Sequence, residues 1–465
     1  MIRNGKEDIG VAFAVNRNEK HIVTITDLTS AGQGVGKIDH YPLFIPNTIP
    51  GEIVEVRVTK TLKRYGFGEV TEWIEQSPDR VVPSCAVYDE CGGCQLQHLS
   101  YEAQLQQKWQ TVRDAMDRIG HLKDVPVHPV KGMETPWRYR NKSQVPIGLQ
   151  QGKAVWGFYR SRTHDIVDTE QCLIQSEEAD QLLNGLRRHL FALGLTPYDE
   201  ERHKGMLRHV IVRTAEATGE TMVVFVTRQK QLKHREEIVK AVRKILPNVT
   251  SIVQNVNSEK TNTILGKTTY PMYGPTTIVD EINGIRFEIS AQSFFQVNSK
   301  QTDDLYRQTL EYAELTGTER VVDADCGIGT ISLFLAKDAA HVHGVEIVEQ
   351  AIEDAKRNAA LNGFDNVTFE VGASEDVVTR WYEEGQSFDV LVVDPPRKGC
   401  DETLIDTILE RHPRRVVYVS CNPATLARDL KMLSDGGYTV EEVQPVDMFG
   451  HSTHIENVAK LTWGR

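Results

Sequence analysis

The last third of the chain repeats one pattern: a short apolar run, a loop of polar or charged residues, and a helical segment. Three of these runs lead into Asp323–Thr330, Asp394–Gly399 and Ser420–Pro423. Apolar strands that alternate with helices predict βαβ units, and therefore a parallel sheet covered by helices on both faces. Sheets of this kind bind ligands beyond the carboxyl ends of their strands. We therefore predict an α/β domain with its site in these loops.

The loop Asp323-Ala-Asp-Cys-Gly-Ile-Gly-Thr330 has the composition of a nucleotide-binding turn. Its glycines allow a ligand close to the backbone, and Glu346 ends the next predicted strand about twenty residues later, where it can accept hydrogen bonds from a ribose. The glycine spacing departs from the dinucleotide pattern G-x-G-x-x-G, which favours adenosylmethionine as the ligand. Asp394 ends the third predicted strand, Phe388–Val393, at the same edge.

A cysteine, Cys421, occupies the turn between the predicted strand Val416–Val419 and the predicted helix Ala424–Leu430. A buried structural thiol is one interpretation, since free cysteine is among the most buried residue types. The Asn422-Pro423 pair that follows is typical of an exposed turn and favours a thiol that faces the ligand.

A histidine-rich segment, His451-Ser-Thr-His454-Ile-Glu456, precedes the last predicted strand. Such residues can bind a metal, but their spacing is not the helical H-E-x-x-H arrangement. A carboxylate brought next to a cysteine at the ligand edge is better interpreted as a proton acceptor. We therefore treat Glu456 as a candidate base.

The length of 465 residues predicts about three domains. The chain has no apolar run of about eighteen residues and no signal-peptide pattern at its first residues, so we expect a cytoplasmic protein without a membrane segment. The net charge is −12, and the acidic excess lies in residues 291–465. A polyanion is therefore expected to bind mainly to the rest of the chain.

Residues 18–75 contain several short β-rich runs separated by glycine- and proline-containing turns, which predicts a small barrel. One segment combines basic and aromatic side chains: Lys60, Lys63, Arg64, Tyr65 and Phe67. This composition suits phosphate contacts and base stacking, although a solvated hairpin explains it equally well. The segment resembles a TRAM domain, a small RNA-binding barrel.

Four of the seven cysteines, Cys85, Cys91, Cys94 and Cys172, form a close triplet joined by a remote fourth residue. Four thiolates can hold either zinc or a [4Fe-4S] cluster. Zinc ribbons usually use two close pairs, so this spacing favours the iron-sulfur cluster, with a structural role. Unligated reduced thiols are the alternative.

Residues 131–162 carry seven basic residues interleaved with aromatic ones. In Trp137-Arg138-Tyr139-Arg140, strand alternation places both arginines on one face, where they can contact phosphates. The alternative is a solvated, charged face over core aromatics. Either interpretation requires this segment to be a strand.

Five motifs together resemble the RNA uracil-5-methyltransferases over nearly the whole chain. They are Ser293-Phe-Phe-Gln296-Val-Asn298, Asp323-x-x-Cys326-Gly327-x-Gly329-Thr330, Asp394-Pro-Pro-Arg-Lys-Gly399, Ser420-Cys421-Asn422-Pro423 and His451-x-x-His454-x-Glu456. The barrel and the cysteines resemble the ribosomal RNA branch more than the transfer RNA branch. The chain departs from the pattern at Asp325, where an aromatic residue is usual, and at Gly450, where proline is common.

The resemblance implies an S-adenosylmethionine-dependent enzyme that forms 5-methyluridine in 23S ribosomal RNA, acting on a flipped uridine as a monomer. It implies an α/β architecture of a TRAM/OB-like barrel (18–75), an α+β central RNA-binding domain with the iron-sulfur site (76–285), and a Rossmann-like methyltransferase domain (286–465). Cys421 matches the nucleophile and Glu456 the base. The cofactor site matches Gln296, Asp325, Glu346 and Asp394, and the cluster ligands match Cys85, Cys91, Cys94 and Cys172.

Three alternatives stay open. The first is the same reaction on transfer RNA, and the second is an RNA-binding homologue whose cofactor binding is weakened by Asp325. The third is an amino-group methyltransferase, which uses an Asp/Asn-Pro-Pro-aromatic loop and no cysteine. Arg397 in place of the aromatic residue, together with Cys421, disfavours that third alternative.

Overall fold

The computed structural model describes residues 15–193 and 195–464, and the chain divides into two compact units. The first contains the described residues through Ser84, with Cys94–Gln107 and His451–Thr453; the second contains Cys85–Gly93, Lys108–Gly450 and the remainder from His454. The amino-terminal residues, where we expect no signal peptide, lie outside the described part. No helix in that part is long and apolar enough to cross a membrane.

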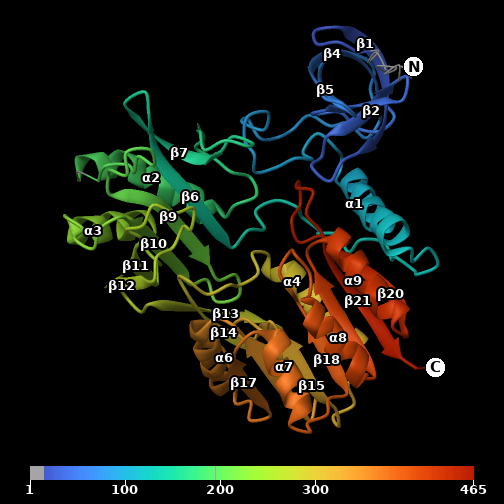
Figure 1. Cartoon of the computed structure of the whole chain (residues 1–465). Coiled ribbons are helices and arrows are strands. Elements are labelled where there is room, and N and C mark those ends of the chain that lie inside the picture. The colour runs from blue at the N-terminus through green and yellow to red at the C-terminus, as the bar shows by residue number, and fades with distance from the viewer. Residues whose placement is uncertain (1–14, 194, 465) are drawn as a thin grey trace, which may run out of the picture. The chain divides into compact units, whose positions relative to one another are not determined.

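The first unit holds a closed barrel of five strands in the order β1-β2-β3-β5-β4 (Figure 1). The strands are β1 (Lys20–Leu28), β2 (Gly34–Ile38), β3 (Tyr41–Ile45), β4 (Ile53–Thr61) and β5 (Gly66–Glu75). Alternate residues point inward and form an apolar core that includes Val23, Ile25, Leu43, Val54 and Val56. Gly34 is required because a Cβ there would lie 2.0 Å from the Thr48 hydroxyl. The predicted small barrel is confirmed.

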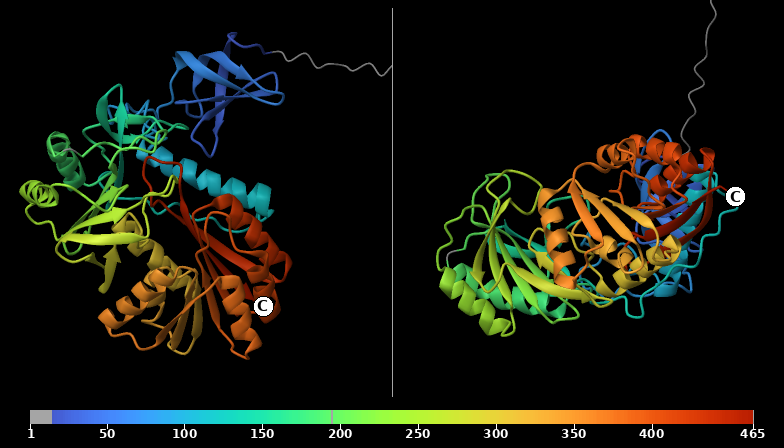
Figure 2. Two further views of the ribbon diagram at one scale, coloured as in Figure 1. Left: turned by 60° about the vertical axis from the view of Figure 1, so that its left-hand side comes forward. Right: turned by 90° about the horizontal axis from the view of Figure 1, so that it is seen from below.

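The second unit contains a seven-stranded central sheet in the order β12-β11-β10-β9-β6-β7-β8. Its strands are β6 (Lys142–Gln150), β7 (Lys153–Tyr159), β8 (Ile166–Asp168), β9 (Leu207–Thr214), β10 (Thr221–Thr227), β11 (Ser251–Val256) and β12 (Thr268–Tyr273). Helices α2 (Glu177–Ala192) and α3 (Arg235–Ile245) cover one face, against Val210 and Val212 (Figure 2). Ile211 points to the other face.

The structure corrects the strand predicted at residues 137–140. Regular strand β6 begins only at Lys142, and Arg138 has a left-handed backbone with φ of 57°. Its guanidinium turns inward, where it pairs with Asp180 at 2.6 Å and donates to the Cys172 carbonyl at 3.0 Å. Arg138 is therefore a structural cation and does not share a strand face with Arg140.

The carboxyl-terminal sheet has the order β17-β16-β15-β18-β19-β21-β20, and a hairpin, β13 (Thr277–Ile282) with β14 (Ile285–Ser290), precedes it. Its strands are β15 (Arg320–Ala324), β16 (His341–Glu346), β17 (Val367–Val371), β18 (Val390–Val393), β19 (Arg415–Ser420), β20 (Tyr438–Val446) and β21 (Glu456–Trp463). The first five are parallel, as predicted, whereas β21 runs antiparallel to β19 and β20.

Helices surround this sheet (Figure 1). They are α4 (Ser299–Ala313), α5 (Thr330–Leu335), α6 (Glu349–Asn362), α7 (Ser374–Glu383), α8 (Glu402–Arg411) and α9 (Pro423–Asp435). Helix α1 (Tyr101–Ala115) lies earlier in the chain and is followed by a π-helical turn, η1 (Met116–Gly120). A Cβ at Gly120 would come within 3.1 Å of the Ala427 carbonyl, so a glycine allows η1 to pack closely on α9.

The two large sheets of the second unit share one hydrophobic core. Ile211, Met222 and Val224 of the central sheet belong to the same buried cluster as Val321 and Val417 of the carboxyl-terminal sheet. Burial of apolar surface is the main favourable term in folding, so each sheet stabilises the other.

Candidate active site

Three of the predicted site residues lie at consecutive strand ends along one edge of the carboxyl-terminal sheet. Ala324 of β15 is paired with Val345 of β16 and with Val393 of β18 in parallel register. One residue further along these strands stand Asp325, Glu346 and Asp394. Because paired positions in parallel strands lie side by side, the three carboxylates gather at this edge.

Hydrogen bonds fix two of these acids. The Ser374 hydroxyl donates to Asp325 at 3.0 Å, and the Gly327 amide donates to Glu346 at 3.2 Å. Asp325 has a left-handed backbone with φ of 66°, a conformation that aspartate adopts more readily than most residues. This geometry gives a physical reason for aspartate where the family pattern has an aromatic residue.

Negative charge accumulates at the edge. Burial raises the pKa of Asp323 to about 7 and that of Asp325 to about 6, although the Ser332 and Ser374 hydroxyls oppose the two shifts. Desolvation and the nearby Asp325 likewise raise the pKa of Asp394 to about 7. One oxygen of the buried Asp323 has no hydrogen-bond partner among the described residues. Such a site favours a cationic ligand, which would stabilise the ionised carboxylates.

The register of β19 and β21 brings Cys421 and Glu456 together. Ser420 is paired with Asn457 in antiparallel register, and the Asn457 amide donates to the Ser420 carbonyl at 3.2 Å. Cys421 follows Ser420 and Glu456 precedes Asn457, so both residues adjoin the last pair of this register. Cys421 is half-buried, so the thiol is not sealed in the core.

Electrostatics link this pair to the acidic edge. Burial, the charge of Glu456 and the charge of Asp394 all raise the pKa of Cys421, while Arg397 lowers it. Burial and Asp394 also hold the pKa of Glu456 well above its usual range, again opposed by Arg397. The thiol, the two carboxylates and the guanidinium therefore form one electrostatic site.

Helix α9 anchors the loop that carries Arg397. The Asn422 side chain caps α9 by accepting from the Ala424 amide, and it donates to the Arg397 carbonyl at 3.0 Å. The Thr425 hydroxyl donates to the same carbonyl at 3.2 Å. No role at the site was predicted for Arg397, although its position three residues after Asp394 is a usable signal.

The loop that contains Gln296 connects the central sheet to the site. The backbone carbonyl of Gln296 accepts a hydrogen bond from the side-chain amide of Asn141 at 2.9 Å. In the same loop, the Ser293 hydroxyl donates to Asp354 of α6 at 2.9 Å. Asn298 ends the loop and caps α4. Gln296 is buried, whereas Phe294 is 70% exposed and thus available to a ligand.

Comparisons with known proteins decide the family. The profile of the tRNA (uracil-5-)-methyltransferases matches residues 100–462, and that of the TRAM domain matches residues 15–71. The chain belongs to the tRNA (uracil-5-)-methyltransferase family. An uncharacterized RNA methyltransferase of Halalkalibacterium halodurans is 56% identical over 96% of this chain and 98% of its own length. One of Clostridium tetani is 48% identical over 97% of both chains.

A solved structure has the same fold as this uracil-5-methyltransferase. It is the Pyrococcus abyssi tRNA (uracil-54, C5)-methyltransferase in complex with S-adenosyl-L-homocysteine, which is 29% identical with a TM-score of 0.76. The similarity covers 95% of this chain and 99% of that one. The protein is therefore an S-adenosylmethionine-dependent RNA methyltransferase of the uracil-5 type, with a TRAM barrel.

The acidic edge fits the cofactor of this family. S-adenosylmethionine carries a sulfonium and an ammonium group, and the site offers the unpartnered Asp323 oxygen and acids with raised pKa values. A Cβ at Gly327 would meet nothing within 4 Å, so this residue of the turn borders open space. The residues present therefore fit the cofactor.

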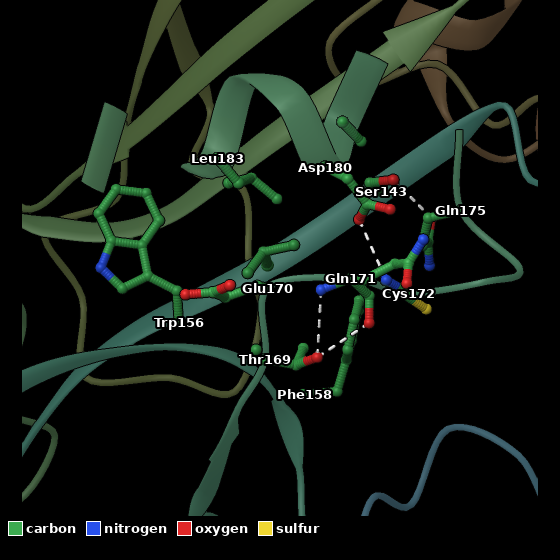
Figure 3. A pocket seen from close by; sticks show the side chains of 13 residues that line it. Ser143, Trp156, Phe158, Thr169, Glu170, Gln171, Cys172, Gln175, Asp180 and Leu183 are labelled. Atoms are coloured by element: carbon green, nitrogen blue, oxygen red, sulfur yellow. Dashed lines mark hydrogen bonds between the residues drawn. The ribbon is translucent and has the colours of Figure 1, made fainter. Parts of the chain in front are cut away.

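The four cysteines predicted as cluster ligands are each half-buried. The Gly93 amide donates to the Cys91 sulfur at 3.4 Å. The Cys172 amide donates to Asp180 at 3.1 Å, and Cys172 lines a small pocket with Trp156 and Phe158 (Figure 3). Among the described residues, no group of three or more cysteine, histidine or acidic side chains is arranged to hold a metal.

Proposed function

We propose that this protein methylates C5 of a uridine in 23S ribosomal RNA, with Cys421 as the nucleophile and Glu456 as the base. The observation that carries this proposal is the β19–β21 register, which pairs Ser420 with Asn457 and so sets the thiol opposite the carboxylate. A thiol and an acid side by side at the ligand edge of a methyltransferase sheet suit covalent catalysis on a pyrimidine.

The proposed reaction begins with Cys421. Carbon 5 of uracil is a poor nucleophile, so the thiolate adds to C6 and converts the ring into an enolate with electron density at C5. Carbon 5 then forms a bond to the methyl group as the bond between that methyl group and the sulfonium sulfur breaks, and S-adenosyl-L-homocysteine would be the leaving group. Glu456 removes the C5 proton, the C6–S bond breaks and the sulfur leaves with the electron pair.

Four residues would hold the cofactor, namely Gln296, Asp325, Glu346 and Asp394. Bound S-adenosylmethionine supplies an electrophilic methyl group. The carboxylate of Glu346 suits a ribose diol, while Asp325 and Asp394 complement positive charge. Arg397, which lowers the pKa of Cys421, favours the thiolate that the first step requires.

The choice of ribosomal over transfer RNA rests on the TRAM barrel and the four cysteines. The Pyrococcus abyssi protein is named as a transfer RNA enzyme, so transfer RNA is the competing substrate. The test is methyl transfer from labelled cofactor to both RNAs, followed by mapping of 5-methyluridine in RNA from cells that lack the protein. A missing 5-methyluridine in transfer RNA alone would reject the ribosomal assignment.

We also propose that Cys85, Cys91, Cys94 and Cys172 hold a [4Fe-4S] cluster. The amide bond to the Cys91 sulfur is of the kind that stabilises a thiolate ligand. The cluster would clamp the loop of residues 85–94 to the region of Cys172 and takes no part in the steps above. Iron and sulfide analysis of anaerobically purified protein tests this, and protein without either element would reject it.

A further inference from the structure

Three cations of the central sheet gather without an acidic partner. Strands β6 and β9 are neighbours in the central sheet (Figure 1). Lys142 on β6 lies directly opposite Arg213 on β9 in their antiparallel register. Arg140 precedes Lys142 by two residues and also acts on it electrostatically. No carboxylate pairs with any of the three among the residues that the structure describes. Like charges opposite each other on paired strands destabilise a sheet, so this arrangement costs the fold stability.

The three cations also have unused hydrogen-bonding capacity. Arg213 is only 3% exposed; one of its terminal nitrogens donates to the Ser293 carbonyl at 2.6 Å, but its Nε has no partner in the described part of the chain. The buried Nε of Arg140 is likewise without a partner there. Burial, then the charges of Arg213 and Arg140, lower the pKa of Lys142 to about 7. Buried charges are normally paired, so the cluster lacks an anion.

The cluster faces the proposed reaction site. Val212, next to Arg213, packs under α2 and α3, so Arg213 points to the opposite face of the sheet, toward the loop that leads to Gln296. Burial lowers the pKa of His454, and the charges of Arg397, Lys108 and Arg140 lower it further. His454 stands two residues before Glu456. Arg213 therefore reaches the loop that leads to Gln296, and Arg140 acts on the segment that carries Glu456.

We propose that Arg140, Lys142 and Arg213 bind a backbone phosphate of the substrate RNA next to the uridine that enters the site. This inference rests on the proposed function, since a flipped nucleotide carries its phosphates with it. Guanidinium and ammonium groups make charge-assisted hydrogen bonds to phosphate oxygens. One phosphodiester would satisfy the unused donors and separate the like charges, so the strain in the free protein is released on RNA binding.

The test is Lys142→Met, which removes the charge but keeps the length of the side chain. The probes are transcripts of 23S ribosomal RNA and of a transfer RNA, bound at a series of salt concentrations. We expect the Kd to rise roughly three- to tenfold and the slope of log Kd against log salt to fall by about one. The affinity for S-adenosyl-L-homocysteine should not change. The matched control is Lys240→Met on the exposed face of α3, which should change neither RNA measurement.

Thermal unfolding separates a binding role from a structural one. Because Lys142 opposes Arg213, the variant should have an equal or higher Tm. Unchanged RNA affinity and salt slope, or a lowered Tm, would overturn the inference. A loss of S-adenosyl-L-homocysteine affinity alone would assign the cations to the carboxylate of the cofactor and reject the phosphate site. Absence of 5-methyluridine formation by the wild-type protein would instead reject the proposed function, because RNA binding is measured without catalysis.

Discussion

Ser420 and Asn457 are paired across β19 and β21, and the side chain of Asn457 donates back to the Ser420 carbonyl. This pair is the last in the register before the proposed nucleophile and base. It fixes two strands that enter the sheet from distant parts of the sequence, so the thiol and the carboxylate are positioned by backbone hydrogen bonds. Rigid positioning of reacting groups lowers the entropy cost of the reaction.

Replacement of Cys421 by alanine should abolish methyl transfer, with a loss of about a thousandfold or more, because alanine has no thiolate that could add to C6. Filter binding after denaturation should detect no covalent RNA adduct. Retained binding of S-adenosyl-L-homocysteine would show that the variant is folded. Methylation at more than a few per cent of the wild-type rate would reject Cys421 as the nucleophile.

Glu456→Gln should separate the two halves of the reaction. The amide has nearly the same shape as the acid but cannot accept the C5 proton, so addition and methyl transfer should proceed while release fails. A denaturation-resistant protein–RNA complex should accumulate, and mass spectrometry of its nucleotide should find the added methyl group. If no complex forms, or if turnover continues, the base is another residue.

The rate of adduct formation should rise with pH. Burial, Glu456 and Asp394 raise the pKa of Cys421, so the reactive thiolate becomes abundant only above the usual thiol range of about 8.5. Arg397→Gln removes the charge that opposes this rise in the pKa of Cys421. The midpoint of the curve of adduct-formation rate against pH should therefore move to higher pH. Lys398→Gln is the control, since Lys398 acts on Asp325. A midpoint that is identical in all three proteins would contradict this assignment.

Binding of S-adenosylmethionine should release protons near neutral pH. In the free protein Asp323 and Asp394 have pKa values of about 7, and Asp325 of about 6, so part of these acids is protonated at pH 6.5. A cationic ligand favours their ionised forms, and its affinity should fall as pH drops from 8 to 6. Calorimetry in buffers of different ionisation enthalpy measures the release. Asp325→Asn should reduce the number of protons released. An unchanged number would exclude Asp325 as one of the groups that lose a proton on binding.

The buried ion pair of Lys108 and Asp447 should be a stability determinant. Its atoms lie 2.6 Å apart, and both side chains are essentially inaccessible to solvent. Lys108→Met leaves the Asp447 charge without its ion-pair partner and should lower the free energy of unfolding by about 3–5 kcal/mol. The surface pair Lys431–Asp435 offers the control, where Lys431→Met should cost less than about 1 kcal/mol. Urea unfolding measures the free energy of unfolding of both variants. Equal losses in the two variants would contradict the prediction that the buried pair contributes more to stability.

Local sequence signals predicted the elements well, because each depends on neighbouring residues. The apolar runs ending at Ala324, Val393 and Ser420 are strands of one sheet, and the barrel was expected from short runs and turns. The family and its cofactor are confirmed by the comparisons. The roles of Cys421 and Glu456 stay predictions.

Features that depend on long-range pairing were not predictable. The residues next to Arg138 in the sequence give no sign that its guanidinium pairs with Asp180 inside the protein. The alternation of aromatic and basic residues around it suggests a strand instead. Lys142 and Arg213 lie opposite each other only because β6 and β9 pair in this register, which neither strand's own sequence specifies. The π-helical turn at Met116–Gly120 is likewise set by tertiary packing, because α9 approaches at Gly120.

The shared core of the two large sheets has a consequence for how this enzyme can be altered. If the chain were cut between the two sheets, Ile211 and Val224 of the central sheet would become exposed to solvent. The residues around Val321 in the carboxyl-terminal sheet, which belong to the same core, would become exposed as well. A catalytic fragment that starts near residue 286 should therefore aggregate. Exchange of substrate preference between relatives would then have to proceed by replacing surface side chains one at a time, because the central sheet cannot be transplanted as a block.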